Sequence, residues 1–391
     1  MKKRLLVTAS TFPRWKGDTE PRFVLDLCKY MMDKYLVTVL VPAYPGAADE
    51  EFQEGVHIIR YHYFPIHKWE ILCYPGAIIP RIKEKKIRIF LVPCLIGALW
   101  TKIALINKDY DLIHSHWIIP QGAVQSFFKK PYVVTGHGGD VTSLNKGIMR
   151  YFKRRCLKNA SVVTAVSDYL KEAEKEISEG IDPKVISMGV DTSKFGAQFR
   201  KDNYFNQGDK KVVLFVGRLA EKKGVRYLID AMDNVDNSIL CIVGDGPLRS
   251  ELEELADTKK TKIIFAGSKT HTELKDIYAS ADVFVAPSVT AEDGDQEGLG
   301  LVMLEAMASG LPIVASKSGG IVQVIRDGEN GLLCEEKAVN QIAGNINKAL
   351  YDSDVRNELI KGSYKTAQEY DYKIQAEKYM NLYESILKKE L

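Results

Sequence analysis

Short runs of apolar residues alternate with longer amphipathic stretches along the whole chain. Ten of the runs are rich in β-branched side chains and cover residues 4–8, 37–41, 112–114, 132–135, 162–165, 212–216, 239–243, 263–265, 283–285 and 313–315. Such runs are typical of parallel strands that are buried on both faces. Between them, the segment 22–33 places Phe23, Leu27, Tyr30 and Met31 on one face of a helix, as in a crossover helix. The pattern therefore predicts an α/β protein with two doubly wound halves.

The length of the chain supports two domains, because 391 residues exceed what one compact core usually holds. The apolar periodicity lapses over residues 196–210, which we interpret as an interdomain linker. We expect an N-terminal Rossmann-like domain over 1–195 and a C-terminal one over 211–373. Tyr379, Tyr383 and Leu387 lie at helical spacing, so a final helix is expected within 374–391.

Composition is ordinary for a globular protein, and the pattern of cysteines argues for a reducing compartment. Six cysteines are dispersed without a Cys-x-x-Cys pair, which disfavours a disulfide scaffold and a zinc site. The apolar stretch 5–9 after the first charged residues is too short for a signal peptide. We therefore expect a cytoplasmic location, which includes the inner face of the cell membrane.

Charge is distributed unevenly along the chain, and a basic run in the first half lies beside an apolar segment that could contact a membrane. Residues 1–160 hold 25 Lys and Arg against 13 Asp and Glu, which leaves 29 against 38 for the rest. The densest basic run, 81–88, directly precedes the apolar segment 89–100. Pro93 and Gly97 interrupt this segment, and Arg88 and Lys102 flank it, so we do not expect it to span a bilayer. A buried domain helix and peripheral contact with an anionic membrane both remain open, whereas no motif indicates nucleic acid.

A glycine-rich loop in the second half carries two carboxylates, Glu297 and Glu305, eight residues apart. If a helix starts in this loop, the two side chains lie roughly 10 Å apart, about the span of a sugar and a ribose joined by a diphosphate. The helix amides that would face such an anion belong to Gly298, Leu299, Gly300 and Leu301. Two solvated glutamates on an amphipathic helix are the plain alternative.

Two further loops of the second half follow predicted strands. The loop 217–224 delivers Arg218 and Lys223, whose charges can neutralise a departing diphosphate without a metal, although a solvated charged turn has the same composition. After the next strand, Gly244 and Gly246 allow a tight turn against which a base can lie, as also happens in plain loops.

In the first half, His137 and Asp140 flank two glycines directly after a predicted strand. A metal pair, a general base and a structural loop are all compatible with this spacing. His114 and His116 share a strand face without an evident third ligand, so a cleft wall is favoured over a metal site. The loop 10–20, which contains Gly17, lacks a Gly-x-Gly-x-x-Gly fingerprint and therefore disfavours a dinucleotide-binding dehydrogenase.

Together these elements resemble the retaining glycosyltransferases of the glycogen-synthase-like family four, also called glycosyl transferases group 1. The resemblance covers most of the chain and is strongest over residues 212–331. It implies the GT-B fold, in which two Rossmann-like domains face each other across a cleft and the last helix packs back on the first domain. Asp18 departs from the family, in which many members carry a second glycine beside Gly17.

Residue roles follow from the resemblance alone. It implies that Arg218 and Lys223 stabilise the leaving diphosphate, that Glu297 with the loop amides orients the sugar, and that Glu305 binds the ribose. The same resemblance implies that His137 and Asp140 contact the donor sugar, that Gly17 lies near acceptor and diphosphate, and that Gly244, Gly246 and Gly267 lie near the nucleotide. Asp109, Asp111, Asp293 and Asp295 form two Asp-x-Asp strings that suit the metal-dependent glycosyltransferase fold, which has one nucleotide domain. We therefore expect no metal and no other cofactor.

The expected activity is transfer of a sugar from a nucleoside-diphosphate sugar to an acceptor hydroxyl, with retention of configuration. A glycan or lipid-linked acceptor of cell-surface polysaccharide or glycolipid synthesis suits the basic, aromatic first half. Two alternatives remain: a nucleotide-sugar epimerase or hydrolase of the same fold, which consumes donor without acceptor, and a non-catalytic nucleotide-sugar-binding protein.

Overall fold

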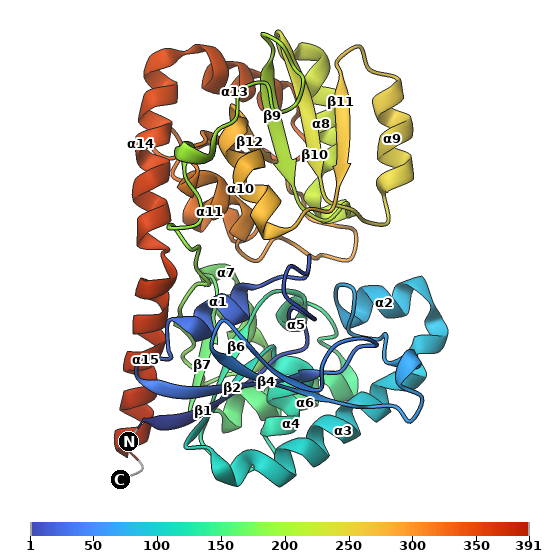
Figure 1. Cartoon of the computed structure of the whole chain (residues 1–391), viewed down its shortest axis with the longest axis vertical. Coiled ribbons are helices and arrows are strands. Elements are labelled where there is room, and N and C mark those ends of the chain that lie inside the picture. The colour runs from blue at the N-terminus through green and yellow to red at the C-terminus, as the bar shows by residue number, and fades with distance from the viewer. Residues whose placement is uncertain (1, 390–391) are drawn as a thin grey trace. The chain divides into compact units, whose positions relative to one another are not determined.

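The computed structural model describes residues 2–389, and the chain divides into two compact units. The first unit contains residues 1–188 and 372–391, and the second contains residues 189–371. Figure 1 shows the order of the elements along the chain. The segment 196–210, expected as a linker, lies within the second unit, where Arg200 donates to the carbonyl oxygen of Ala281 over 2.8 Å.

The first unit is built on a sheet whose strands lie in the order β3-β4-β2-β1-β5-β6-β7-β8. Their bounds are β1 Lys3–Thr8, β2 Tyr35–Pro42, β3 Glu50–Gln53, β4 Val56–Tyr61, β5 Leu112–His116, β6 Tyr132–Gly136, β7 Val162–Ala165 and β8 Lys184–Val185. All neighbouring pairs are parallel except the edge pair of β3 and β4. The central strands β5 and β6 are buried along their whole length, as is typical of a parallel sheet that is covered on both faces.

Helices cover both faces of this sheet. Figure 1 shows α1 on one side of β1, β2 and β4, with α3 and α4 on the other side. The helices are α1 Phe23–Lys29, α2 Ile78–Glu84, α3 Leu91–Ile106, α4 Ala123–Gln125, α5 Gly139–Thr142, α6 Gly147–Asn159, α7 Asp168–Ile177 and α15 Tyr372–Lys389. Short helical turns are η1 His67–Trp69, η2 Lys86–Phe90, η3 Asn107–Asp109 and η4 Ile118–Gly122.

The last helix, α15, is held in the first unit by buried tyrosines. Tyr383 and Tyr379 are fully buried, and the hydroxyl of Tyr383 lies 2.6 Å from Nδ1 of His114 on β5. The ring of Tyr383 also meets Tyr35 edge to face, with centroids 5.6 Å apart. Helical spacing of aromatic residues near the C-terminus therefore encodes a contact with strands more than 250 residues earlier.

The second unit has a parallel six-stranded sheet in the order β11-β10-β9-β12-β13-β14. Its strands are β9 Lys211–Val216, β10 Ser238–Val243, β11 Ile263–Gly267, β12 Val283–Ala286, β13 Ile313–Ser316 and β14 Leu332–Cys334. Its helices are α8 Val225–Ala231, α9 Arg249–Asp257, α10 His271–Ser280, α11 Leu301–Ala308, α12 Ile321–Val324, α13 Val339–Tyr351 and α14 Ser353–Glu369, with the turns η5 Ala197–Phe199, η6 Glu221–Lys223 and η7 Met232–Asn234. Because the strands are parallel, the loops that follow β9, β10 and β11 share one edge of the sheet.

All ten predicted strands are present, so the prediction of two α/β units, each built on a mainly parallel sheet, is confirmed. The strands β3, β4, β8 and β14 were not predicted. β3 is a charged edge strand and β8 has two residues, so neither carries the continuous apolar run of a buried strand.

Candidate active site

Three loops at the carboxyl ends of β9, β10 and β11 are joined by backbone hydrogen bonds. The amide of Gly217 donates to Val243 over 2.9 Å, and the amide of Gly244 donates to Gly267 over 2.9 Å. Gly244 has a φ of 130°, and a β-carbon at this position would collide with the carbonyl oxygen of Gly217. The structure thus brings Gly244 and Gly267 together, and the close approach of the first two loops requires glycine at position 244.

The loop after β9 positions Lys223 against the glycine-rich loop. Gly224, with a φ of 61°, ends the turn η6 and begins α8, and a β-carbon there would collide with Pro287. Nζ of Lys223 forms an ion pair with the carboxylate of Glu297, and both side chains are largely buried. The sequence placed these two residues in separate roles, whereas the structure pairs them directly.

Charge around Glu297 keeps its carboxylate ionised. Burial by itself raises the pKa of Glu297, but the ammonium groups of Lys223 and Lys222 and the amide of Gly298 outweigh it, so the pKa is lowered. Lys222 is held nearby by an ion pair with Asp295 at 2.9 Å. Asp295, half of an Asp-x-Asp string, therefore already has a cationic partner.

The helix α11 begins in the glycine-rich loop. Gly300 precedes it with a φ of 85° and a ψ of 58°, a left-handed conformation that glycine adopts without strain. Amides in the first turn of a helix have no carbonyl partner within that helix, so those of Leu301 and Val302 can bind an anion. Lys223, Glu297 and Gly300 line the same pocket, together with residues of β9 and β12 such as Phe215 and Phe284. The structure thus joins the basic loop to the glycine-rich loop.

Glu305, on α11, is positioned by a buried tyrosine. The hydroxyl of Tyr278 on α10 donates to Glu305 over 2.9 Å, and Tyr278 is fully buried. Thr270 and Glu273 form a capping box that fixes the start of α10. One carboxylate oxygen of Glu305 is therefore held in place, while His271 approaches the other at 3.9 Å.

In the first unit, Asp140 holds the backbone of its loop. Its carboxylate accepts from the amides of His137 (3.0 Å), Gly138 (2.9 Å) and Ile118 (2.8 Å). These bonds fix the His137 loop to the segment that follows β5. Contact of Asp140 with a sugar stays a prediction.

Three histidines of the first unit lie in a row, in which His114 and His116 are buried and His137 is half-buried. The rings of His114 and His116 are tilted against each other with centroids 4.2 Å apart, whereas His116 stacks on His137. Nδ1 of His116 lies 2.9 Å from Nε2 of His137. Burial lowers the pKa of His137 to about 3, so its ring is neutral near pH 7. Because Nε2 of His116 is buried without a hydrogen-bond partner among the described residues, the less costly arrangement leaves it as an acceptor. Nδ1 of His116 then donates to His137, whose own proton lies on Nδ1.

The loop with Gly17 is braced by Asp18. Asp18 is buried and accepts from Nε (2.8 Å), Nη2 (2.7 Å) and the amide (2.7 Å) of Arg14. Burial raises the pKa of Asp18, but the hydrogen bonds from Arg14 outweigh this and lower it. Gly17 has a φ of 82° with open space around it. Asp18, which departs from the family pattern, is thus a structural anchor of this loop.

One cluster that sequence reasoning missed lies after β4. His62, His67 and Glu70 bring potential metal-ligating atoms within 4.8 Å of one another among residues 2–389. Both nitrogens of His62 face carboxylates, Glu70 at 2.7 Å and Asp49 at 2.9 Å. A ring that donates twice must be protonated, so these ion pairs already account for the cluster.

Comparison with known proteins extends over both units. Residues 21–194 match the family described as Glycosyltransferase Family 4, and residues 197–366 match the family described as Glycosyl transferases group 1. An uncharacterised glycosyltransferase of Methanocaldococcus jannaschii is 30% identical over 311 residues, which are 77% of this chain and 83% of the relative. The chain belongs to the group 1 glycosyltransferases. It is therefore an enzyme that transfers glycosyl groups.

Solved structures agree with the fold of this glycosyltransferase. Sucrose-phosphate synthase from Thermosynechococcus elongatus superposes with a TM-score of 0.79 at 22% identity, covering 98% of this chain and 99% of that chain. The Anabaena protein HepE, solved in complex with UDP and glucose, gives a TM-score of 0.74 at 19% identity, covering 98% and 100%. The predicted GT-B fold is confirmed.

Proposed function

We propose that this glycosyltransferase moves a sugar from a nucleoside-diphosphate sugar to a hydroxyl acceptor with retention of configuration. The observation that carries the proposal is the pocket of the second unit, where Lys223, Glu297 and the start of α11 come together. A cation and helix amides at one edge of a parallel sheet suit a diphosphate. The UDP and glucose bound to HepE, a protein of the same fold, support this donor class.

Lys223 and Arg218 are assigned to the departing diphosphate. As the glycosidic bond to the phosphate oxygen breaks, negative charge grows on that oxygen, and fixed cations stabilise it without a metal. In the free enzyme, Glu297 holds the Lys223 ammonium in this position. Arg218 directly follows Gly217 on the same loop. The hydrogen bond from the Gly217 amide to Val243 therefore holds the backbone from which the Arg218 side chain extends.

The state of Glu297 favours retention over inversion. An inverting enzyme needs a free carboxylate or imidazole to deprotonate the acceptor from the opposite face of the sugar. Glu297 is engaged by Lys223, and its charge is stabilised by that contact. We therefore assign Glu297 to orienting the sugar and Lys223, and assign the uptake of the acceptor proton to the departing phosphate oxygen.

Glu305 and His137 are assigned to substrate hydroxyls. One oxygen of Glu305 accepts from Tyr278, which leaves the carboxylate oriented to accept from the two hydroxyls of a ribose. In the first unit, His137 offers a neutral ring with a proton on Nδ1, which suits a hydrogen bond to a sugar oxygen. This role of His137 needs no charged imidazole, in agreement with its lowered pKa.

A donor panel tests the proposal. We expect one of the UDP-, GDP- or ADP-sugars to raise the melting temperature of the wild-type enzyme and to be consumed only when an acceptor is present. Consumption without acceptor indicates a hydrolase or epimerase, and binding without consumption indicates a non-catalytic protein. NMR of the product then reports whether the anomeric configuration is kept.

A matched arginine pair tests the site itself. Arg218→Ala should reduce turnover by about 100-fold, because one preorganised charge contact is worth roughly 3 kcal/mol in the transition state. Arg226→Ala is the control, because Arg226 lies on α8 of the same unit and pairs with Glu251 at 3.5 Å on the surface. Equal turnover of the two variants would remove Arg218 from the reaction.

A further inference from the structure

The helix α3 exposes most of its apolar surface. The segment 86–109 is long and apolar enough to cross a membrane, yet only 17% of its most apolar part is buried. Its buried side is a single stripe of four residues one turn apart, namely Leu91, Leu95, Leu99 and Ile103. A helix that packs one stripe against its own domain lies along the surface of that domain, because crossing a bilayer would strip these contacts.

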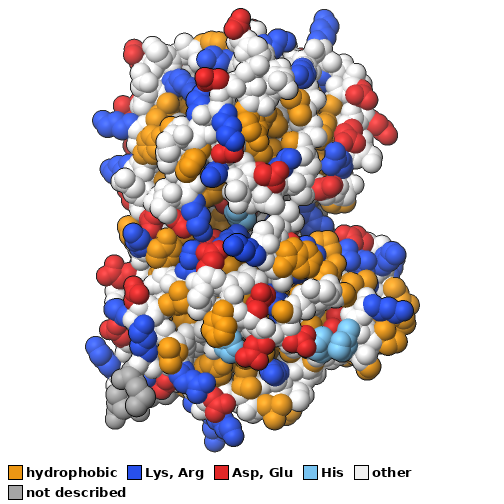
Figure 2. All heavy atoms as spheres, viewed as in Figure 1, with side chains coloured by type: hydrophobic (Ala, Val, Ile, Leu, Met, Phe, Trp, Pro, Cys, Tyr) orange, Lys and Arg blue, Asp and Glu red, His pale blue; other side chains and the backbone are white. Residues whose placement is uncertain are grey.

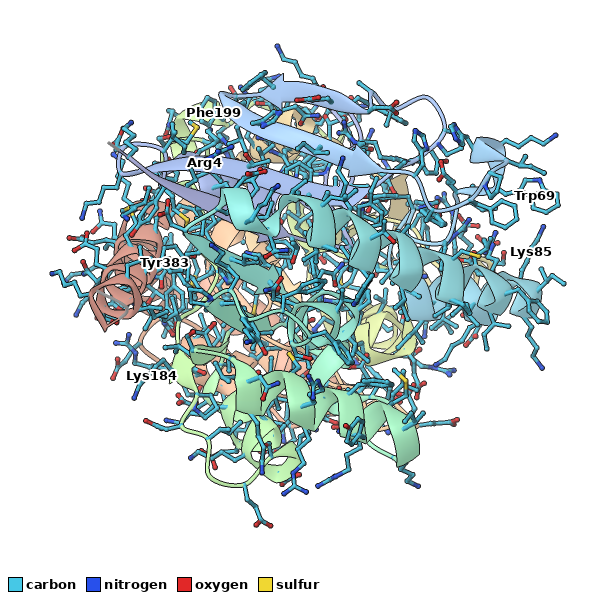
Figure 3. The ribbon with its side chains drawn as sticks, turned by 90° about the horizontal axis from the view of Figure 1, so that it is seen from below. Arg4, Trp69, Lys85, Lys184, Phe199 and Tyr383 are labelled. Atoms are coloured by element: carbon cyan, nitrogen blue, oxygen red, sulfur yellow. The ribbon has the colours of Figure 1, made fainter. Side chains whose placement is uncertain are left out.

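The other sides of this segment carry large apolar groups in solvent. Phe90 is 72% exposed, Leu105 is 64% exposed and Trp100 is 48% exposed. Ile87, Ile89 and Ile96 are exposed as well. Figure 3 views the first unit from the side on which α3 crosses the strands. Contiguous exposed apolar side chains of this size mark an interaction surface.

Basic side chains border the apolar surface. Residues 81–108 contain seven Lys and Arg and one acidic residue, Glu84. Glu84 is already engaged by Arg81 at 2.6 Å and Arg88 at 2.9 Å, while Lys85 and Lys86 are exposed. Figure 3 shows Lys85 and the half-exposed Trp69 at the same end of the first unit. In Figure 2, blue and orange side chains gather where Figure 1 places α2.

The surface continues from α3 toward α6. Trp100 meets Phe128 with ring centroids 5.6 Å apart, and Arg155 of α6 lies over the ring of exposed Phe127 at 4.4 Å. α6 has no acidic residue, and four of its basic residues are at least partly exposed, whereas Lys153 is buried. Its Tyr151 is 58% exposed. Aromatic rings beside basic groups suit the interface between lipid headgroups and acyl chains.

We propose that the exposed face of α3, together with its basic borders, docks the enzyme on the surface of an anionic lipid bilayer. The apolar side chains enter the boundary between headgroups and acyl chains, and the Lys and Arg side chains contact lipid phosphates. A second copy of the chain suits this face poorly, because self-association would oppose basic borders of the same sign. Docking would bring the glycosyltransferase to an acceptor that is carried by lipid.

Vesicle binding without nucleotide tests this proposal independently of the proposed function. Wild-type enzyme should sediment with vesicles of phosphatidylcholine and phosphatidylglycerol at low salt, and much less with phosphatidylcholine alone. Lys85→Glu/Lys86→Glu should weaken binding at least about 25-fold, from a factor of about 5 for each lysine. The control is Lys260→Glu/Lys262→Glu, which makes the same change of charge at two exposed lysines of the second unit. This variant should retain vesicle binding, with a loss of affinity much smaller than that of Lys85→Glu/Lys86→Glu.

Apolar insertion requires its own variants. Trp100→Ser/Leu105→Ser should weaken binding about 20-fold or more, whereas Tyr351→Ser should not, although Tyr351 is exposed to the same degree, 47%. Brominated lipids should quench the fluorescence of wild type more than that of Trp100→Phe. Circular dichroism checks that each variant is folded.

Several results would overturn the proposal. These are no binding to anionic vesicles, equal binding of Trp100→Ser/Leu105→Ser and wild type, or quenching that does not involve Trp100. A concentration-dependent dimer that Trp100→Ser/Leu105→Ser abolishes would assign the face to a second copy. Detergent-free sedimentation velocity distinguishes that outcome.

Discussion

Replacing Lys223 by Met should affect both stability and turnover, because Lys223 is the direct partner of Glu297. The Lys223 side chain is 17% exposed and that of Glu297 is 13% exposed. Solvated ion pairs contribute about 0.2–1 kcal/mol, while breaking a buried pair costs about 3–5 kcal/mol. The partial exposure and the remaining Lys222 charge place the expected loss in the free energy of unfolding at about 2 kcal/mol.

A double-mutant cycle isolates the contact. The free energy of unfolding is measured in urea at pH 7 for wild type, Lys223→Met, Glu297→Gln and the double variant. We expect a coupling energy of about 1–2 kcal/mol, because the two side chains touch. Turnover of Lys223→Met should fall by about 100-fold or more.

The same pair sets the acid limit of stability. The pKa of Glu297 in the folded state lies below its ordinary 4.5, so its stabilisation is present above pH 4.5 and is lost as the pH falls through the folded-state value. In Lys223→Met, the ammonium that lowers the pKa of Glu297 is absent, so burial raises this pKa relative to wild type. The loss of stability on acidification should therefore begin at a higher pH. A coupling energy near zero together with an unchanged acid transition would refute a buried Lys223–Glu297 pair.

Three further outcomes are expected. Tyr278→Phe removes the hydrogen bond to Glu305 and should weaken nucleotide affinity about 5-fold in calorimetry, whereas Tyr351→Phe, which loses a surface bond to Asp236, should not; equal affinities would contradict the role of Tyr278. His116→Asn removes the stacked ring that orients His137 and should lower kcat about 10-fold with little change in nucleotide affinity; an unchanged kcat would argue against this positioning role. Burial lowers the pKa of His62, but bonds to Glu70 and Asp49 outweigh it and raise the pKa, so its stabilisation is present below pH 6.5 and is lost as the pH rises through the folded-state value. The free energy of unfolding should therefore decline less between pH 6 and 8 in His62→Gln than in wild type. Equal declines in the two proteins would show that protonated His62 does not stabilise the fold.

Much of the fold could be predicted because buried parallel strands have a clear sequence signal. The runs that became β9 and β10 are apolar almost throughout, which leaves few alternatives to a central strand. β3 could not be predicted, since an edge strand such as Glu50–Gln53 needs no apolar run. The helix α3 was visible as an apolar segment, but its exposure depends on which sides the domain covers.

The candidate site was predictable in its parts and less so in its contacts. Glycine-rich loops after strands were recognisable as tight turns, because glycine permits the close approach seen between Gly217 and Gly244. The pairing of Lys223 with Glu297 joins residues 74 positions apart, and no local pattern encodes it. The bracing of the Gly17 loop by Arg14 and Asp18 was equally hidden, because a buried ion pair and a solvated charged turn have the same composition.

Calorimetric titration with nucleosides, nucleoside monophosphates and nucleoside diphosphates tests the central claim most directly. If Arg218 and Lys223 bind a diphosphate, the diphosphate of one base should bind at least about 10-fold tighter than its monophosphate, and Arg218→Ala should erase most of that difference. Equal affinities for the two nucleotides, or an unchanged preference in Arg218→Ala, would contradict the account.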